Sequence, residues 1–202
     1  MFYLYFLLFL VLITATIFAA PLRYKVWVTT AIVAITTIAL AVPSIAVLAG
    51  TDDFRIIEMV GPLFGRESLL IDSLSALFLL IIGVAGCATL IYSKGYIQQY
   101  LDKKSSAHIS MHYVALAVLI VSMMMVVTSS GGFSFLLAWE LMTIASFILI
   151  LFEADRQDVR RAALNYLVMM DIGFMFLVAG FVLLYNVTGS ANFAAVECYF
   201  KV

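Results

Sequence analysis

The sequence predicts an all-α membrane protein with six transmembrane helices. The prediction rests on composition: 65% of the 202 residues are hydrophobic, only 11% are charged, and the mean hydropathy is +1.15. Soluble domains have roughly 45–50% apolar and about 25% charged residues, so composition excludes an ordinary soluble enzyme. The net charge of -1 gives no basic field for nucleic acid, so we expect no nucleic-acid partner.

The positions of the helices follow from long uncharged runs, because about 20 apolar residues cross the hydrocarbon core of a bilayer. We expect the first run to be a retained helix and not a signal peptide, since no basic residue precedes it and no convincing cleavage site follows. A break at Ser129-Ser130-Gly131-Gly132 divides the longest run in two. The expected helices span about 2–20, 26–49, 70–92, 109–128, 133–152 and 162–185, in a single transmembrane domain over 1–202.

Residues 52–68 form the longest expected connection. Gly61-Pro62 and Gly65-Arg66 are turn signals between two short β-prone runs. The pattern predicts a small outward-facing hairpin on the membrane surface.

Basic residues are unequally divided between the two sides of the predicted bundle. The first, third and fifth connections carry Arg23, Lys25, Lys94, Lys103, Lys104, Arg156, Arg160 and Arg161, whereas the other side carries Arg55, Arg66 and Lys201. Because cytoplasmic loops are enriched in Lys and Arg, we expect the N-terminus outside and a multi-pass location in the cell inner (cytoplasmic) membrane. The alternating charges around Arg160 also predict a short amphipathic loop helix.

Glu140 is the most unusual residue within a predicted helix. It lies in FSFLLAWELMTIASF, where a mid-membrane charge costs roughly 2.5–3.5 kcal/mol on insertion scales. Such residues persist when they pair, line a wet cavity or carry ions. Helical spacing puts Thr143 on the same face, where its hydroxyl can support the carboxyl group. We expect Glu140 to transfer protons; the alternative is a neutral glutamate that joins helices by hydrogen bonds.

Asp171 and His112 are further proton-transfer candidates. Asp171 lies well inside the last predicted helix and is either a second relay carboxylate or one partner in a helix–helix hydrogen bond. His108 and His112 share a helical face near the cytoplasmic end of the fourth helix. We expect a surface-facing pair, and proton entry through His112 is the alternative, because histidine titrates near neutral pH.

Asp72 has a structural interpretation, because an acid at the start of a helix caps it and favours the positive end of the helix dipole. No metal site is expected, since two histidines without a third ligand are a weak signal and the two cysteines have no metal or redox spacing. No cofactor is expected either, because the sequence has no phosphate-binding loop and no haem-type histidine pair.

Three segments carry a family resemblance: LLIDSLSALFLLIIGVAGCATLIYSKGYIQQY (69–100), GFSFLLAWELMTIASFILILFE (132–153) and VRRAALNYLVMMDIGFMFLVAGFVLLYNVTGS (159–190). They resemble the N-terminal part of the proton-translocating antiporter-like membrane subunits. That family includes subunits of respiratory complex I, the Mrp antiporters and the membrane-bound hydrogenases. The last segment most resembles the large membrane subunit of hydrogenase-4 and formate hydrogenlyase.

The resemblance implies a membrane subunit, or an N-terminal fragment of one, in a redox-driven proton- or sodium-translocating complex. In the family, the glutamate matched by Glu140 is switchable and pairs with a lysine on a later helix. Asp72 matches the family's acid at the start of the third helix, and Asp171 falls where hydrogenase-type members often have histidine. The implied partners are other membrane subunits, one of them supplying a buried lysine, together with peripheral redox subunits and lipids. The alternative is a structural or assembly subunit that conducts no ions.

Overall fold

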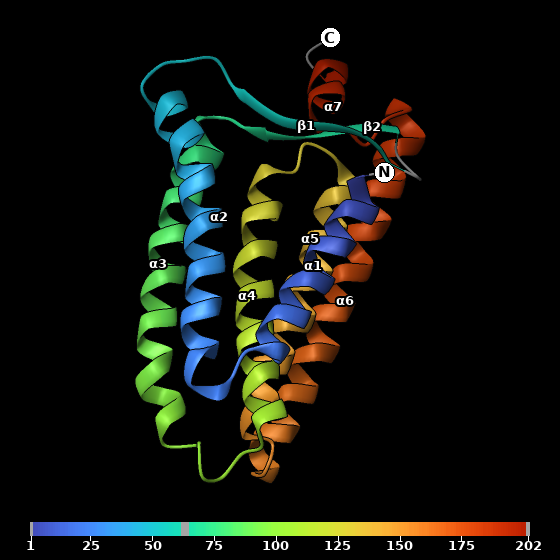
Figure 1. The fold of residues 1–202 in the computed structure, drawn as a ribbon. Coiled ribbons are helices and arrows are strands. Elements are labelled where there is room, and N and C mark those ends of the chain that lie inside the picture. Colours follow the sequence, from blue (N-terminus) through green and yellow to red (C-terminus); the bar gives the residue numbers. More distant parts are fainter. Residues whose placement is uncertain (1, 62–64, 201–202) are drawn as a thin grey trace.

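The structure, a computed structural model, describes residues 2–61 and 65–200. These residues form long helices that run alternately up and down, with a two-stranded hairpin across one end (Figure 1). The long helices are α1 (Phe2–Ala19), α2 (Lys25–Leu48), α3 (Ser73–Gln98), α4 (Ser106–Thr128), α5 (Gly132–Ile150) and α6 (Gln157–Thr188). Shorter helical elements are η1 (Leu22–Tyr24), η2 (Leu151–Glu153) and α7 (Phe193–Phe200).

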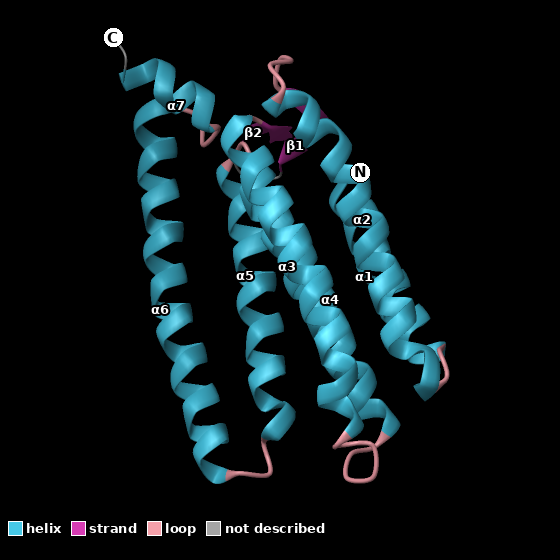
Figure 2. Cartoon of the chain, turned by 90° about the vertical axis from the view of Figure 1, so that its left-hand side faces the viewer, coloured by secondary structure: helices cyan, strands magenta, loops and turns pink. Residues whose placement is uncertain are grey.

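The two ends of the bundle differ in structure and charge. The basic end carries the α1–α2, α3–α4 and α5–α6 connections, where most of the Lys and Arg residues lie. The hairpin end carries β1 (Phe54–Gly61), β2 (Gly65–Ile71), the α4–α5 connection and α7 (Figures 1 and 2). Strands β1 and β2 are antiparallel, with a register shift between Arg55 and Ile57.

Among the residues that the structure describes, five segments are long and apolar enough to cross a membrane: Leu22–Leu48, Ser73–Gln98, Ser106–Thr128, Gly132–Glu153 and Gln157–Thr188. The first predicted span corresponds to α1, which contains the shorter apolar stretch Phe6–Ala19. The prediction of an all-α membrane fold is confirmed.

Helix α6 differs from its prediction at both ends. Its 32 residues extend for about 48 Å at 1.5 Å per residue, well beyond a hydrocarbon core of about 30 Å. The first turns, which contain Asp158, Arg160 and Arg161, therefore reach the membrane surface as part of the same helix. The separate amphipathic loop helix predicted for this segment is wrong, and α7 was not predicted.

Helix α4 occupies the centre of the bundle. It packs against α1, α2, α3 and α5, and it buries large side chains such as Ile109, Tyr113 and Ile120. Helices α2 and α3 pack closely against each other, and a Cβ at Gly83 would lie 2.3 Å from the Thr37 methyl carbon. Helix α6 packs mainly on α5 and stays largely exposed (Figure 2).

The predicted break at Ser129–Gly132 joins three parts of the hairpin end. Ser130 N donates to Ser68 O at 3.0 Å, and Ser130 Oγ accepts from Ser68 N at 2.8 Å. On its other side, Ser130 O accepts from Phe193 N at 2.9 Å, and Gly132 N donates to Ala191 O at 3.0 Å. The break is therefore a short extended segment held between the hairpin and the chain that leads into α7.

Candidate proton-transfer site

Glu140 lies near the middle of α5, on the side that faces α6. It is half-buried, and its Oε2 is inaccessible to solvent and has no hydrogen-bond partner. The carboxyl group lines a groove of about 410 Å³ between the two helices. The other lining residues are all apolar: Phe133, Leu136 and Leu137 from α5, and Phe174, Val178 and Val182 from α6.

Asp171 lies on α6, about one turn before the part of that helix that lines the groove. It precedes Phe174 by three residues and Val178 by seven, so helical spacing places it on the groove-lining face of α6. Asp171 is half-buried, and its carboxyl group interacts electrostatically with that of Glu140. The structure therefore brings together two of the carboxylates singled out in the sequence.

Thr143 does not support Glu140 in the predicted way. Its side chain is buried, and Oγ1 donates a 3.1 Å hydrogen bond to the carbonyl oxygen of Trp139, one turn earlier in α5. The prediction that this hydroxyl bonds the Glu140 carboxyl group is wrong in this structure. Threonine hydroxyls in helices commonly bond the carbonyl oxygen four residues back, and here that local bond prevails.

A second polar contact between α5 and α6 lies closer to the basic end. Ser146 Oγ and Tyr166 Oη are 2.5 Å apart, and Ser146 Oγ also donates to the Met142 carbonyl oxygen. The sequence analysis did not identify this pair. Both residues are ordinary in apolar helices, and only the relative rotation of α5 and α6 reveals that they meet.

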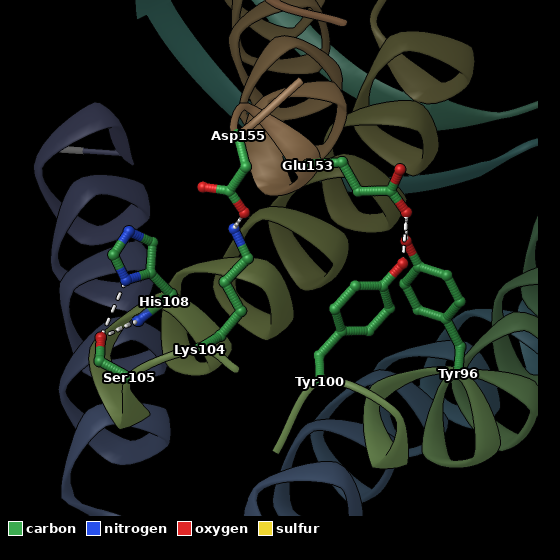
Figure 3. A network of polar contacts seen from close by, with 7 residues as sticks. All are labelled: Tyr96, Tyr100, Lys104, Ser105, His108, Glu153 and Asp155. Atoms are coloured by element: carbon green, nitrogen blue, oxygen red, sulfur yellow. Dashed lines mark hydrogen bonds and ion pairs between the residues drawn. The ribbon is translucent and has the colours of Figure 1, made fainter. Parts of the chain in front are cut away.

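The basic end contains a polar network that joins the end of α3 and the α3–α4 connection to η2 and the following turn (Figure 3). The hydroxyl groups of Tyr96 and Tyr100 both donate to Glu153 Oε1, at 2.8 and 2.6 Å. Lys104 forms an ion pair with Asp155. The hydrogen bond to Glu153 raises the pKa of the Tyr100 phenol, and the bond from Lys104 lowers the pKa of the Asp155 carboxyl group.

The two histidines lie in different environments, so the prediction of a surface-facing pair is wrong for one of them. His108 is exposed, and its Nδ1 lies 2.8 Å from Ser105 Oγ (Figure 3). The His112 ring is half-buried, 4.7 Å from the Phe152 ring and 6.0 Å from the Tyr96 ring between centroids. Its buried Nδ1 has no hydrogen-bond partner. Packing of α3 and η2 against α4 covers one histidine and leaves the other in contact with solvent.

Asp72 occupies the helix-start position expected from sequence. It is the N-cap of α3, and its Oδ1 accepts a 2.7 Å hydrogen bond from Ser75 N. This bond satisfies one of the free backbone donors of the first turn. Ser75 Oγ in turn donates to the Val127 carbonyl oxygen at 2.5 Å, which ties the start of α3 to the end of α4.

Lys25 differs from its expected role as a loop charge. Only 2% of the residue is exposed, and its ammonium group donates to Ser110 Oγ and to the Ile17 carbonyl oxygen. Within residues 2–61 and 65–200, no carboxylate lies within ion-pair distance of this group. The carbonyl oxygens at the end of α1 favour a cation, because the helix dipole is negative there. Lys25 thus joins α1, α2 and α4 at the basic end.

The fold and parts of the sequence match known proteins. The structure superposes with a TM-score of 0.76 on a chain of the membrane-bound sulfane sulfur reductase, an archaeal respiratory membrane complex, covering 94% of this chain and 37% of that one at 17% identity. Residues 129–201 match the transmembrane family model of NADH:quinone oxidoreductase and Mrp antiporters. The chain has the antiporter-like fold. The resemblance inferred from the sequence is confirmed.

Sequence relatives of this antiporter-like chain match over a limited part of their length. An uncharacterized protein of Mycobacterium tuberculosis is 37% identical over 125 residues, which are 61% of this chain and 18% of that protein. A Staphylococcus saprophyticus protein that carries the name antiporter subunit mnhA2 is 30% identical over 126 residues, 62% of this chain and 15% of its own. The chain therefore spans less than a fifth of the length of these relatives. Among the residues that the structure describes, no three His, Cys, Asp or Glu side chains gather as metal ligands.

Proposed function

We propose that this antiporter-like chain is a membrane subunit of a redox-driven complex that moves protons or sodium ions, with Glu140 as the switchable carboxylate. The observation that carries the proposal is the unpartnered, buried Oε2 of Glu140 in an apolar groove of a membrane-crossing helix. A carboxylate at this depth is costly unless a proton or a nearby cation neutralises it. The group can therefore change its charge when a cation approaches or withdraws.

The cation has to come from outside the described groove, because every other lining residue is apolar. We propose that a buried lysine from another membrane segment approaches Glu140 between α5 and α6. An ion pair formed there would favour the ionised glutamate, and separation would favour proton uptake.

Asp171 is the second relay group of this proposal, because it interacts with Glu140 across the groove. A second carboxylate at this depth in the bundle provides another group that can take up a proton on the proposed path. His112 is the proposed proton-entry residue on the basic side, where its ring nitrogen is unpartnered. The basic end would face the cytoplasm, in keeping with the distribution of Lys and Arg.

The energy requirement explains why redox partners belong to the proposal. Moving one charge against 100 mV costs about 2.3 kcal/mol, and nothing in the proposed site supplies it. Peripheral redox subunits of the hydrogenase or complex I type would supply it, as the resemblance of the third matched segment to hydrogenase-4 and formate hydrogenlyase implies. The likeness to a respiratory membrane complex supports the fold of such a subunit.

The test compares Glu140→Gln with Asp102→Asn, a control carboxylate exposed in the α3–α4 connection. Each variant is purified with its native membrane partners and placed in sealed vesicles, and ion uptake is measured with the complex's electron donor. We expect the Gln variant to assemble normally and to lose most ion transport, and the control to transport normally. Normal transport in Glu140→Gln, with assembly lost only in Glu140→Leu, would instead identify a structural subunit that conducts no ions.

A further inference from the structure

A surface feature separate from the Glu140 groove lies at the basic end, on the side of the bundle formed by α2 and α3. Four residues form it, and we call them the basic aromatic patch: Arg23 and Tyr24 from η1, Trp27 from α2, and Lys94 from α3. Trp27 is 59% exposed and Tyr24 is 53% exposed. The Lys94 ammonium lies 5.2 Å from the centre of the Trp27 ring, so the patch bridges two helices.

Two basic residues, Arg23 and Lys94, supply the charge of this patch. Within the part of the chain that the structure describes, neither Arg23 nor Lys94 has a carboxylate within ion-pair distance. Lys104, at the same end, pairs with Asp155. The contacts of the two patch cations are with rings: the Arg23 guanidinium carbon lies 6.0 Å from the centre of the Tyr24 ring. A cation beside an aromatic ring keeps its charge and its hydrogen-bond donors, so both groups remain available to an anion.

An apolar surface continues from the patch towards the middle of the membrane. Ile35 on α2, with Val84 and Ile91 on α3, are among the most exposed apolar side chains. The two helices that carry them pack against each other. Next to Lys94 in the sequence, a Cβ at Gly95 would meet nothing within 4 Å, so the surface of α3 is open at Gly95. Charge at the membrane boundary followed by exposed apolar side chains matches the layout of a phospholipid.

We propose that the basic aromatic patch binds the phosphate headgroup of an anionic phospholipid, whose acyl chains lie along Ile35, Val84 and Ile91. Basic sites between transmembrane helices bind anionic headgroups, and Trp and Tyr favour the headgroup level of a bilayer. The planar guanidinium of Arg23 suits two phosphate oxygens, and the Lys94 ammonium adds a point charge. A zwitterionic headgroup carries its own cation and therefore gains less from the two basic side chains. This binding is independent of ion transport through Glu140.

The test measures binding of dioleoylphosphatidylglycerol to the protein purified with its native membrane partners in neutral detergent. Dioleoylphosphatidylcholine and inorganic phosphate are titrated in parallel, and bound lipid is counted by native mass spectrometry. The variant Arg23→Gln/Lys94→Gln removes both charges from the patch. Its matched control, Arg160→Gln/Arg161→Gln, removes two exposed charges at the same end of the bundle.

We expect phosphatidylglycerol to bind more tightly than phosphatidylcholine. The patch variant should weaken this binding about thirtyfold, since each basic residue near a membrane surface contributes about a factor of five. The control should retain full affinity, as should Lys94→Arg, which keeps the charge. Equal binding by the patch variant and the wild type would overturn the proposal. If inorganic phosphate displaced phosphatidylglycerol at the same concentration, the patch would be a simple anion site and not a lipid site.

Discussion

Helices α4 and α6 are both apolar and both long enough to cross a membrane, yet they have opposite surroundings. Helix α4 is enclosed by α1, α2, α3 and α5, whereas α6 packs chiefly on α5 and buries only Ala163 and Phe181. Hydropathy therefore indicates which segments enter a membrane but not which faces meet protein. The Glu140 groove lies where the enclosed part of the bundle ends, between α5 and the exposed α6.

The largest expected difference in stability comes from shortening one isoleucine to alanine in each of the two helices. Ile120→Ala in α4, where 4% of the residue is exposed, should lower the free energy of unfolding by about 2–5 kcal/mol, because it leaves a cavity. Ile172→Ala in α6, at 50% exposure, should cost far less. Denaturant titration of the purified protein in detergent gives both values, and equal losses would show that α6 is covered as fully as α4.

A substitution at Ser110 tests the polar contacts in the enclosed region around α4. Ser110→Ala removes a hydroxyl that accepts from the buried Lys25 ammonium, and losing a partner of a buried charged group costs about 1–3 kcal/mol. Thermal unfolding should show this loss. Adding Lys25→Met should recover stability, because the apolar side chain needs no hydrogen bond. A double variant less stable than Ser110→Ala alone would show that the ammonium group itself stabilises the junction of α1, α2 and α4.

Two glycines extend the comparison between enclosed and exposed helices, because changing each to alanine should alter the free energy of unfolding in opposite directions. Gly83→Ala introduces a Cβ only 2.3 Å from the Thr37 methyl carbon and should destabilise the α2–α3 contact by about 1–3 kcal/mol. Gly180→Ala in α6 meets nothing within 4 Å and should stabilise the helix by about 0.5–1 kcal/mol. Both are read from denaturant midpoints, and a destabilising Gly180→Ala would reveal an unexpected close neighbour of α6.

The smallest expected effect concerns pH at the basic end. The bond from Lys104 lowers the pKa of Asp155, so the ion pair contributes fully above the ordinary carboxyl pKa and is lost as pH falls through the lowered one. Amide hydrogen exchange in residues 99–105 should be faster in Asp155→Asn than in the wild type at pH 7. The difference should shrink as pH falls through the lowered pKa of Asp155, and a difference that does not change with pH would exclude the carboxylate charge as its cause.

Local patterns in the sequence predicted much of this fold. Uncharged runs locate the helices, Asp72 precedes its helix as a cap, and β1 and β2 lie on either side of the predicted turn, of which Pro62 lies outside the described residues. The candidate site was predictable only in part. Glu140 and Asp171 are conspicuous because carboxylates are rare in apolar runs, but their meeting depends on how α5 and α6 rotate about their axes. The burial of Lys25 and of His112 depends on neighbours that are distant in the sequence.

The extended segment at Ser129–Gly132 has a mechanical consequence for α5. Main-chain hydrogen bonds to Ser68, Ala191 and Phe193 fix the start of the helix from two sides, whereas its other end is held by side-chain bonds at Glu153 and Asp155. If α5 tilts, it would thus pivot about its first residues. Glu140 lies about 12 Å along the helix from that pivot and Ile150 about 27 Å. The displacement of Glu140 would therefore be less than half of the displacement of Ile150.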